Sequence, residues 1–337
     1  MKFDFVIGNP PYQETTKDTS DKPIYNLFMD AAFGVSDNVT LIHPARFLFN
    51  AGKTPKDWNN KILQDIHFKV LDYQQDSSKV FANTDIKGGV AITHRDAKKD
   101  FGAIGLFSSF KELNTISAKV RAYGFSPLSD LVYVQTKFNL EALYKDHPEL
   151  KSRIGSKGKE KRLTTSIFEL PIFTISRKTN TQVEILGLQG TNERTIRYVE
   201  RKYLEDSVNF DKFKIVLPAS NGSGAIGEVL SAPLIGEPLI GYTQTFISIG
   251  AFTNVDEAQN AFKYIKGKFS RAMLGVLKIT QHNNKETWRM VPVQDFTTTS
   301  DIDWSKSIAE IDRQLYAKYG LDENEINFIE TKVKEMQ

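Results

Sequence analysis

The sequence contains no cysteine among its 337 residues, which excludes a disulfide framework and any metal site built on thiolates. It also contains no apolar run near the roughly 18 residues that span a bilayer, and its first residues do not form a signal peptide. These absences predict a cytoplasmic protein that does not enter a membrane. Histidine is scarce, and we expect no metal because the histidines lack the spacing of metal ligands: His43, His67, His94, His147 and His282.

Neither sign of charge dominates, since 44 Lys and Arg residues oppose 41 Asp and Glu residues to give a net charge of +3. This balance permits binding to nucleic acid but does not predict it, so any contact with DNA has to come from local basic patches. The hydrophobic fraction of 40% and the length suit a soluble globular protein of two domains.

Signatures of other enzymes are missing as well. The sequence has no Gly-x-Ser-x-Gly elbow and no Walker loop. The acid-x-Lys ending of metal-dependent nucleases occurs at 85–87, 200–202 and 330–332. None of these places follows a clear strand, so we assign no nuclease to the chain.

The sequence does contain a distinctive segment at its start, where residues 3–12 read Phe-Asp-Phe-Val-Ile-Gly-Asn-Pro-Pro-Tyr. Its first half is a short apolar run, which is typical of a buried parallel strand. Asn9, Pro10, Pro11 and Tyr12 then follow at the carboxyl end of this strand. Open α/β sheets bind their ligands at that edge, so we expect a functional site there.

These four residues have the groups that activate an amine on a nucleobase. The lone pair of an exocyclic amine is delocalised into the ring, and two acceptors can draw the amine toward sp3 geometry. The side-chain carbonyl of Asn9 and the backbone carbonyl of Pro10 are suitable acceptors, and the two prolines restrict the loop before substrate arrives. Tyr12 offers a ring face for an extruded base. The alternative is an ordinary turn, because Asn-Pro sequences commonly mark loops.

Strand and helix patterns alternate over the first hundred residues. The predicted elements are strands at 3–8, 39–44, 68–73 and 89–93 and helices at 23–33 and 58–66. Strands separated by helices imply βαβ units and a parallel sheet. The predicted fold class is therefore α/β, with this segment as the later half of a doubly wound, Rossmann-like domain.

The order of these features resembles a known family, the gamma class of N6-adenine DNA methyltransferases. Within it, the chain is similar over its whole length to the methylase part of type IIG restriction-modification enzymes. The resemblance implies methyl transfer from S-adenosylmethionine to adenine N6 in double-stranded DNA, with the target base flipped into a pocket. It is carried by Asn-Pro-Pro-Tyr, a helix, the strand that ends at Pro44, Ala45-Arg46-Phe47-Leu48, and Ser78-Lys79-Val80-Phe81 before a glycine-containing strand.

The same resemblance implies roles for individual residues. Asn9, Pro10 and Pro11 would form the catalytic loop, and Tyr12 would belong to it while also stacking on the base. Phe81 corresponds to an aromatic residue that often stacks on the flipped adenine; the alternative is a core aromatic at the start of a strand. Arg46 is expected to contact DNA.

One departure from the family concerns the cofactor. Gamma-class enzymes carry their glycine-containing cofactor motif before Asn-Pro-Pro-Tyr, and only eight residues precede Asn9 here. We therefore expect a partial chain, whose cofactor half lies on the parent polypeptide or on a separate chain, and an unpaired sheet edge that favours such a partner. The competing hypothesis is a non-catalytic DNA-binding or specificity module that retains the motif as a relic.

A second place in the sequence has the glycine spacing of a cofactor loop. The apolar run that ends at Pro218 is followed by Gly222, Gly224 and Gly227 in the pattern Gly-x-Gly-x-x-Gly. No acidic residue ends the strand, and Pro233 interrupts the helix that should receive a cofactor. The alternative is a glycine-rich loop of a recognition domain.

The pattern of strands and helices becomes irregular from about residue 105, which is expected of a target-recognition domain of mixed α and β structure. We predict domains at 1–104, 105–300 and 301–337, the last made of two helices. A basic loop could follow DNA phosphates, although a solvated loop is the alternative. Its cationic residues are Lys151, Arg153, Lys157, Lys159, Lys161 and Arg162.

Residues 253–277 have apolar residues every three or four positions and are predicted to form one helix. Its apolar stripe suits a protein core, while Lys268 and Arg271 on the basic side could face DNA. Gln281 and Asn283 follow, and their amides suit adenine edges. The alternative for both is a polar loop.

Overall fold

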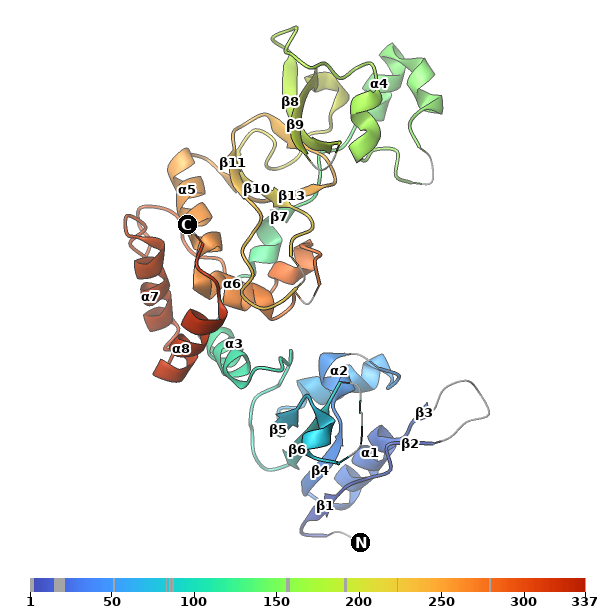
Figure 1. Ribbon diagram of the computed structural model, residues 1–337, viewed down its shortest axis with the longest axis vertical. Coiled ribbons are helices and arrows are strands. Elements are labelled where there is room, and N and C mark those ends of the chain that lie inside the picture. The colour runs from blue at the N-terminus through green and yellow to red at the C-terminus, as the bar shows by residue number, and fades with distance from the viewer. Residues whose placement is uncertain are drawn as a thin grey trace. The chain divides into compact units, whose positions relative to one another are not determined.

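The structure is a computed structural model that describes residues 3–14, 22–50, 52–82, 84, 86, 88–155, 158–190, 193–222, 224–278 and 280–336 (Figure 1). It divides into two compact units, Met1–Asn114 and Thr115–Gln337, which we call unit 1 and unit 2. The boundary between them falls ten residues after the predicted one at 104, and the two C-terminal helices belong to unit 2.

Unit 1 contains a four-stranded sheet with the strand order β1-β4-β6-β5. Strand β1 is parallel to β4, but β6 is antiparallel to both β4 and β5. The expectation of a wholly parallel sheet is therefore wrong, because β5 and β6 form a hairpin that inserts β6 between β4 and β5. The elements are β1 (Val6–Gly8), β2 (Gln13–Glu14), β3 (Lys22–Pro23), α1 (Tyr25–Val35), β4 (Asn38–Pro44), a 3-10 helix (Arg46–Phe49), α2 (Lys56–Gln64), β5 (Phe68–Gln74), a 3-10 helix (Ser77–Lys79) and β6 (Val90–Asp96).

Both helices of this unit pack on the same hydrophobic cluster. The cluster contains Met29 of α1, Leu41 of β4, Phe47 of the 3-10 helix at 46–49 and Ile62 of α2. The two helices are also joined by a polar contact, because Trp58 Nε1 donates a hydrogen bond of 3.0 Å to Asp30. A separate contact joins the start of α1 to the Asn-Pro-Pro-Tyr motif, because the backbone N–H of Ile24 donates to the Tyr12 carbonyl.

The first strand lies at the end of the sheet and exposes apolar side chains. Phe5 is 70% exposed and Ile7 is 81% exposed. Ile7 is in register with Thr40 of β4, while the neighbouring Val6 packs against the helical side. A sheet edge with unpaired backbone groups and large exposed apolar residues is a surface to which a further strand can add.

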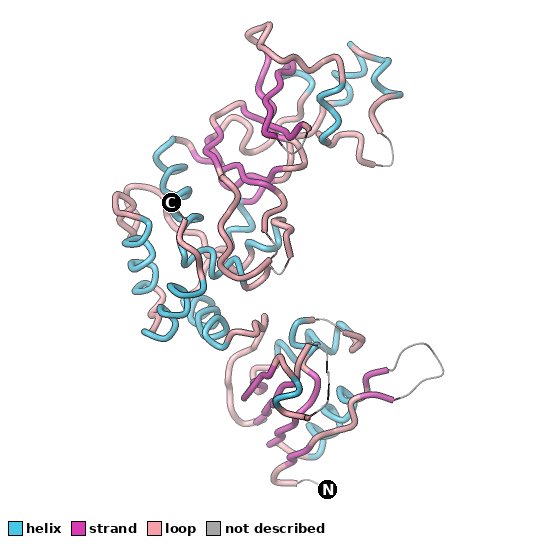
Figure 2. Tube along the Cα trace, in the orientation of Figure 1, coloured by secondary structure: helices cyan, strands magenta, loops and turns pink. Residues whose placement is uncertain are grey.

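Unit 2 contains two sheets, with strand orders β11-β10-β13-β7 and β12-β8-β9. Short strands are joined by long loops (Figure 2). The elements are α3 (Lys111–Tyr123, which begins in unit 1), β7 (Val132–Tyr133), α4 (Leu140–Asp146), β8 (Gln182–Gln189), β9 (Glu193–Glu200), β10 (Phe213–Pro218), β11 (Leu234–Gly236), β12 (Ile240–Tyr242), β13 (Phe246–Phe252), α5 (Val255–Lys266), α6 (Lys268–Gly275), α7 (Ile308–Lys318) and α8 (Glu323–Lys332).

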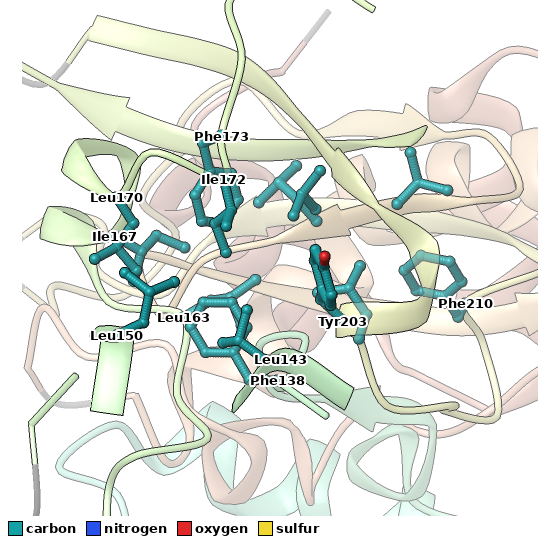
Figure 3. Close-up of a cluster of buried hydrophobic side chains, with 14 residues drawn as sticks. Phe138, Leu143, Leu150, Leu163, Ile167, Leu170, Ile172, Phe173, Tyr203 and Phe210 are labelled. Carbon is teal, nitrogen blue, oxygen red and sulfur yellow. The ribbon is translucent and has the colours of Figure 1, made fainter. Parts of the chain in front are cut away.

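One part of unit 2 has its own hydrophobic cluster around β8, β9 and α4. Figure 3 shows Phe138, Leu163 and Tyr203 in this cluster with aliphatic side chains around them. The hydroxyl of Tyr203 is satisfied at the edge of the cluster, where it bonds to Asp146 at 3.1 Å and to His147 at 3.1 Å. The cluster gives the β8–β9 hairpin a stable support.

The helix predicted at 253–277 is in fact two helices, α5 and α6. Gly267 has an extended backbone conformation, with φ −60° and ψ 153°, and separates them. Asp312 of α7 stabilises the break, because its carboxylate accepts hydrogen bonds from the backbone N–H of Lys268 and Phe269. A side chain 44 positions away in the sequence therefore begins α6, so the local pattern could not reveal the break.

The last two helices form as the sequence predicts. Ser307 and Asp322 begin α7 and α8 with complete capping boxes. Gly320 follows α7 with φ +62°, a conformation that glycine adopts without steric cost. Among the residues that the structure describes, no helix is both long and apolar enough to span a bilayer.

Candidate active site

The Asn-Pro-Pro-Tyr motif leaves β1 at the edge of the unit 1 sheet and opens into a cleft of about 760 Å³. The cleft is lined by both polar and apolar side chains. Its lining residues are Asn9, Pro10, Pro11, Tyr12, Gln13, Pro23, Tyr25, Pro44, Arg46, Gly52, Lys53 and Ile86. The structure thus brings all four predicted catalytic residues and Arg46 to one cavity.

Asn9 and Pro10 have acceptors that remain available in this cleft. The Asn9 side chain is exposed and forms no hydrogen bond to any residue that the structure describes. The loop is held at the last residue of the motif, because the Tyr12 carbonyl accepts a hydrogen bond of 3.1 Å from the backbone N–H of Ile24. A loop held at its far end keeps its free acceptors at a constant place without using them.

Two aromatic rings lie close together at this place: Tyr12 lines the cleft, and Phe81 does not line it but contacts Tyr12. The centroids of Tyr12 and Phe81 are 6.4 Å apart, and the ring planes make an angle of 64°. A planar base cannot lie flat on both rings in this arrangement, so only one ring can stack on it. The Tyr12 hydroxyl is buried without a hydrogen-bond partner among the described residues, and burial raises its pKa.

A 3-10 turn holds Phe81 in position. Asp76 caps this turn by accepting from the backbone N–H of Ser78, and the Phe81 backbone N–H donates to the Ser77 carbonyl at 2.9 Å. Phe81 itself is partly buried and contacts Tyr12 edge-on. Its ring is therefore neither a full member of the core nor freely exposed, which leaves both interpretations of it open.

A stacked aromatic pair forms the floor of the cleft. Tyr25 lies 5.8 Å from His43, with an angle of only 6° between the rings. His43 Nδ1 lies 3.2 Å from the Pro44 carbonyl and Nε2 lies 2.7 Å from the Thr93 hydroxyl. Because a carbonyl only accepts, Nδ1 carries the proton and Nε2 accepts from Thr93.

Burial controls the ionisation of this floor. It lowers the pKa of His43 to about 4 and raises that of Tyr25 to about 12. Both groups are therefore uncharged at neutral pH, and neither supplies a base for proton transfer. Their contribution is a rigid, neutral floor.

The remaining side chains give the cleft a positive character. Arg46 is exposed, and its guanidinium forms no hydrogen bond or ion pair with the residues described. Lys53 adds a second cation, and none of the lining residues that the structure describes is acidic. The charge therefore favours an anionic ligand.

The glycine loop at 222–227 is closed by its own chain. The backbone N–H of Gly224 donates to the Glu228 carboxylate at 3.1 Å, and a Cβ on Gly222 would lie only 2.0 Å from the same carboxylate. A Cβ on Gly227 would meet the Lys332 carbonyl at 2.5 Å. These glycines permit close packing, and the described loop has no room for a cofactor phosphate or ribose.

The basic loop of unit 2 stays on the surface. Lys161 forms an ion pair with Glu205, and Lys157 lies outside the described residues. The other four predicted cations are exposed, and three of them line a second cavity of about 470 Å³. The four are Lys151, Arg153, Lys159 and Arg162, of which all but Lys151 line that cavity.

Two further predicted DNA contacts are wrong. Arg271 is only 2% exposed, and its guanidinium donates to backbone carbonyls that include those of Gly227 and Glu228. Asn283 is fully buried and donates to the Pro218 carbonyl. Neither side chain can reach DNA in this fold, since both are used inside unit 2.

Two neighbouring predictions remain open. Gln281 is exposed, and its backbone carbonyl accepts from Asn221. Lys268 is partly exposed and pairs with Glu330 at 2.5 Å. An ion pair with exposed partners is weak, so it does not prevent Lys268 from meeting a phosphate.

Sequence reasoning missed several residues that shape the cleft: Tyr25, His43, Gly52, Lys53 and Gly88. The signal for one of them was visible, because Gly88 and Gly89 form a glycine pair at the start of a predicted strand. Within the described ranges, no group of three His, Asp or Glu side chains could hold a metal ion.

Comparison with known proteins gives a consistent result for the first unit. Residues 1–81 match the family Eco57I restriction-modification methylase. The expected similarity to restriction-modification methylases is therefore confirmed for this segment, which contains all the described lining residues of the cleft except Ile86. The match supports a DNA methyltransferase.

A particular relative is an uncharacterized adenine-specific methylase from Mycoplasma pneumoniae. The two sequences are 32% identical over 95 residues, which is 27% of this chain and 22% of that protein. The chain thus matches less than a quarter of the length of this relative.

Two solved structures align with 98% of the residues of this chain, at low sequence identity. The type IIG restriction endonuclease BpuSI aligns with a TM-score of 0.35 and 11% identity over 53% of its length. The type IIL restriction-modification enzyme MmeI, in complex with DNA, aligns with a TM-score of 0.33 and 9% identity over 56% of its length. TM-scores of this size do not establish a shared fold, so the similarity to methylases rests on the family match of residues 1–81 and on the 95-residue match to the Mycoplasma pneumoniae protein.

Proposed function

We propose that this chain takes part in the methylation of adenine N6 in double-stranded DNA, as in gamma-class enzymes of restriction-modification systems. The observation that carries this proposal is the open pair of acceptors at the end of β1. Asn9 and Pro10 line a cleft large enough for a base, and the loop is held by the Tyr12 carbonyl.

The role of the loop is to orient the target amine. The Asn9 side-chain carbonyl accepts one amine hydrogen, and the Pro10 carbonyl accepts the other. Two acceptors fixed in advance favour the geometry in which the nitrogen lone pair is available for attack. The nearby rings of Tyr12 and Phe81 support this role, because one of them can stack on an adenine extruded from the duplex.

We propose S-adenosylmethionine as the methyl donor, in line with the similarity to methylases. The described residues do not form a site for it: the glycine loop is filled by Glu228, and no carboxylate lines the cleft to hold a ribose. The donor is therefore bound with the help of a further protein segment. The exposed edge of β1, with Phe5 and Ile7, is the surface on which such a segment fits.

Unit 2 is proposed to recognise the DNA target. Arg153, Lys159 and Arg162 support this role, since they remain exposed around one cavity. Phosphate contacts by such residues fix the position of a protein on DNA but do not read its sequence.

The test is a calorimetric titration of the full chain with S-adenosylmethionine and with mixed-sequence DNA, followed by radiolabelled methyl transfer to that DNA. Turnover by the chain alone that depends on Asn9 supports methylation but overturns the need for a further segment. DNA binding without donor binding supports a chain that depends on a further segment. A chain that binds neither DNA nor the donor contradicts the proposal.

A second candidate function is a non-catalytic DNA-binding or specificity module. The observation that favours it is the same closed glycine loop, which leaves the described chain without a donor site. The two functions differ in one result: substitution of Asn9 leaves the biological activity of a non-catalytic module unchanged.

A further inference from the structure

The side chain of Arg46 is held in the active-site cleft by two glycines. A Cβ added to Gly88 would lie 2.5 Å from Arg46 Cγ, and one added to Gly52 would lie 3.3 Å from Arg46 Cβ. Both glycines have φ near +90°, a conformation that other residues rarely adopt. The backbone thus passes on both sides of the aliphatic part of Arg46 and restricts where its charge can go.

The charge at the end of this side chain has no counterpart in the described protein. The guanidinium forms no ion pair or hydrogen bond there, although it lines the same cleft as Asn9. Ordering a long cationic side chain costs conformational entropy, and here no internal bond offsets that cost. This arrangement is typical of a group prepared for an external anion.

The start of α1 provides a second, independent positive contribution. Helix α1 begins at Tyr25 in the cleft, and its N-cap residue, Ile24, supplies no side-chain hydrogen bond. The first N–H groups of a helix without such a cap carry partial positive charge. Arg46 and the beginning of α1 therefore favour an anion from two sides of one cavity.

We propose that Arg46, held by Gly52 and Gly88, binds the phosphodiester that flanks the adenine in the cleft. This inference rests on the proposed function and adds a named ligand group to it. A guanidinium matches two phosphate oxygens with two parallel N–H donors. The phosphate contact fixes the sugar-phosphate backbone of the extruded nucleotide while Asn9 and Pro10 hold its amine, so Arg46 is a positioning residue.

The first experiment measures the affinity of the full chain for mixed-sequence duplex DNA at several salt concentrations. Each neutralised phosphate contributes about 0.9 to the slope of log K against log salt concentration. Arg46→Gln is expected to lower that slope by about one unit, and Arg46→Lys to retain the slope with weaker binding. The control is Lys98→Gln, which removes a charge of unit 1 that is 79% exposed and does not line the cleft.

A pair of glycine variants separates the position of Arg46 from its charge. Gly88→Ala displaces the side chain and is expected to lower the slope as Arg46→Gln does. Gly102→Ala is the matched control, because Gly102 has φ +74° but no atom within 4 Å of the added Cβ. If both glycine variants bind DNA equally, the cradle, by which we mean Gly52 and Gly88 around the Arg46 side chain, has no role in binding.

A small-molecule titration identifies which phosphate is bound. We expect deoxyadenosine 5′-monophosphate to bind more tightly than deoxyadenosine, as measured by NMR titration, and Arg46→Gln to abolish the difference. Equal binding of the two ligands by the native chain overturns the inference but leaves the proposed function standing. Absence of any DNA binding by the native chain overturns both.

Discussion

The cleft of unit 1 and the glycine loop of unit 2 use their polar side chains in opposite ways. In unit 1, Asn9 and Arg46 lie exposed in a cleft without partners among the described residues. Near the glycine loop of unit 2, charged side chains point inward and have partners. Arg271 donates to the Glu228 carbonyl. Lys278 donates to the Asn221 carbonyl at 2.7 Å and forms an ion pair with the Glu228 carboxylate. In this comparison, the polar side chains without partners lie in the candidate site, while those with partners stabilise the fold of unit 2.

The N-terminal ends of the helices show a similar difference between the two units in their side-chain hydrogen bonds. Helices α1 and α2 of unit 1 have no side-chain hydrogen bond at their N-caps, Ile24 and Pro55. Helices α5, α7 and α8 of unit 2 are capped by Asn254, Ser307 and Asp322. Among the described residues, the N-cap side chains therefore accept no hydrogen bond from the first N–H groups of α1 and α2, whereas N-cap side chains accept from those of α5, α7 and α8.

The strongest test of this comparison replaces a buried cation of unit 2. Arg271→Met leaves several buried carbonyls without donors, so we expect the free energy of unfolding to fall by about 3–5 kcal/mol. Chemical denaturation followed by circular dichroism measures the loss. Arg289→Met is the control, because the Arg289 side chain is 52% exposed, and it should change stability by less than about 0.5 kcal/mol. Equal losses in the two variants would contradict the structural role of Arg271.

The corresponding change in unit 1 removes function without removing stability. Asn9→Ala is expected to lower the rate of methyl transfer by about 100-fold or more, as is typical for loss of one preorganised hydrogen-bonding group. Its melting temperature should stay the same because the side chain is exposed. The radiolabel assay measures the rate in a complex reconstituted with the segment that completes the donor site, and Asn60→Ala on the exposed side of α2 is the control. Unchanged methylation by Asn9→Ala would favour the non-catalytic module.

The response to pH should have opposite signs in the two units. Burial holds the pKa of His43 at about 4, below the value near 6.5 of the unfolded chain, so the stability of unit 1 falls as the pH drops from 6.5 to 4. Burial raises the pKa of Asp312 from 3.8 to about 6, so its charge costs unit 2 stability as the pH rises from 3.8 to 6. Each effect has an upper size of about 3 kcal/mol.

Hydrogen exchange with mass spectrometry measures this difference, because peptides from each unit are observed separately. Protection of unit 1 should decrease on acidification from pH 6.5, and His43→Gln should reduce that dependence. Asp312→Asn should remove the dependence of unit 2 between pH 4 and 6 while keeping an acceptor for α6. The same sign of response in both units would refute the assignment.

A smaller effect is expected at the helix caps. Ser307→Ala removes the hydroxyl that accepts from the Glu310 backbone N–H, which should cost unit 2 about 1 kcal/mol. Thermal denaturation of the variant measures the resulting shift in melting temperature. Ser176→Ala on the surface should leave the melting temperature unchanged, and a shift as large as that of Ser307→Ala would make the capping argument untenable.

Local patterns in the sequence predicted the elements of unit 1 and the final helices well. The predicted strand at 39–44 and the helix at 23–33 correspond to β4 and α1 within one or two residues. These elements depend on short-range periodicity. The antiparallel direction of β6 was not predictable in this way, because pairing between distant strands decides it.

The site was predictable only in part for a similar reason. The Asn9–Tyr12 motif is contiguous, and its groups could be read directly from the sequence. The burial of Arg271 and the cradle around Arg46 depend on contacts with residues far along the chain, such as Gly88. A basic residue on a helix gives no local sign of whether it faces solvent or the carbonyls of another segment.

The glycine loop of unit 2 has a consequence for how such patterns are interpreted. Glu228 is tethered a few residues from the N–H of Gly224, so its carboxylate is present at a very high effective concentration, about millimolar or more for a short tether. A free anion has to outcompete this resident carboxylate at every encounter. The loop therefore behaves as a binding motif supplied with a permanent ligand, and its glycine spacing reports the shape of a backbone and not the presence of a cofactor.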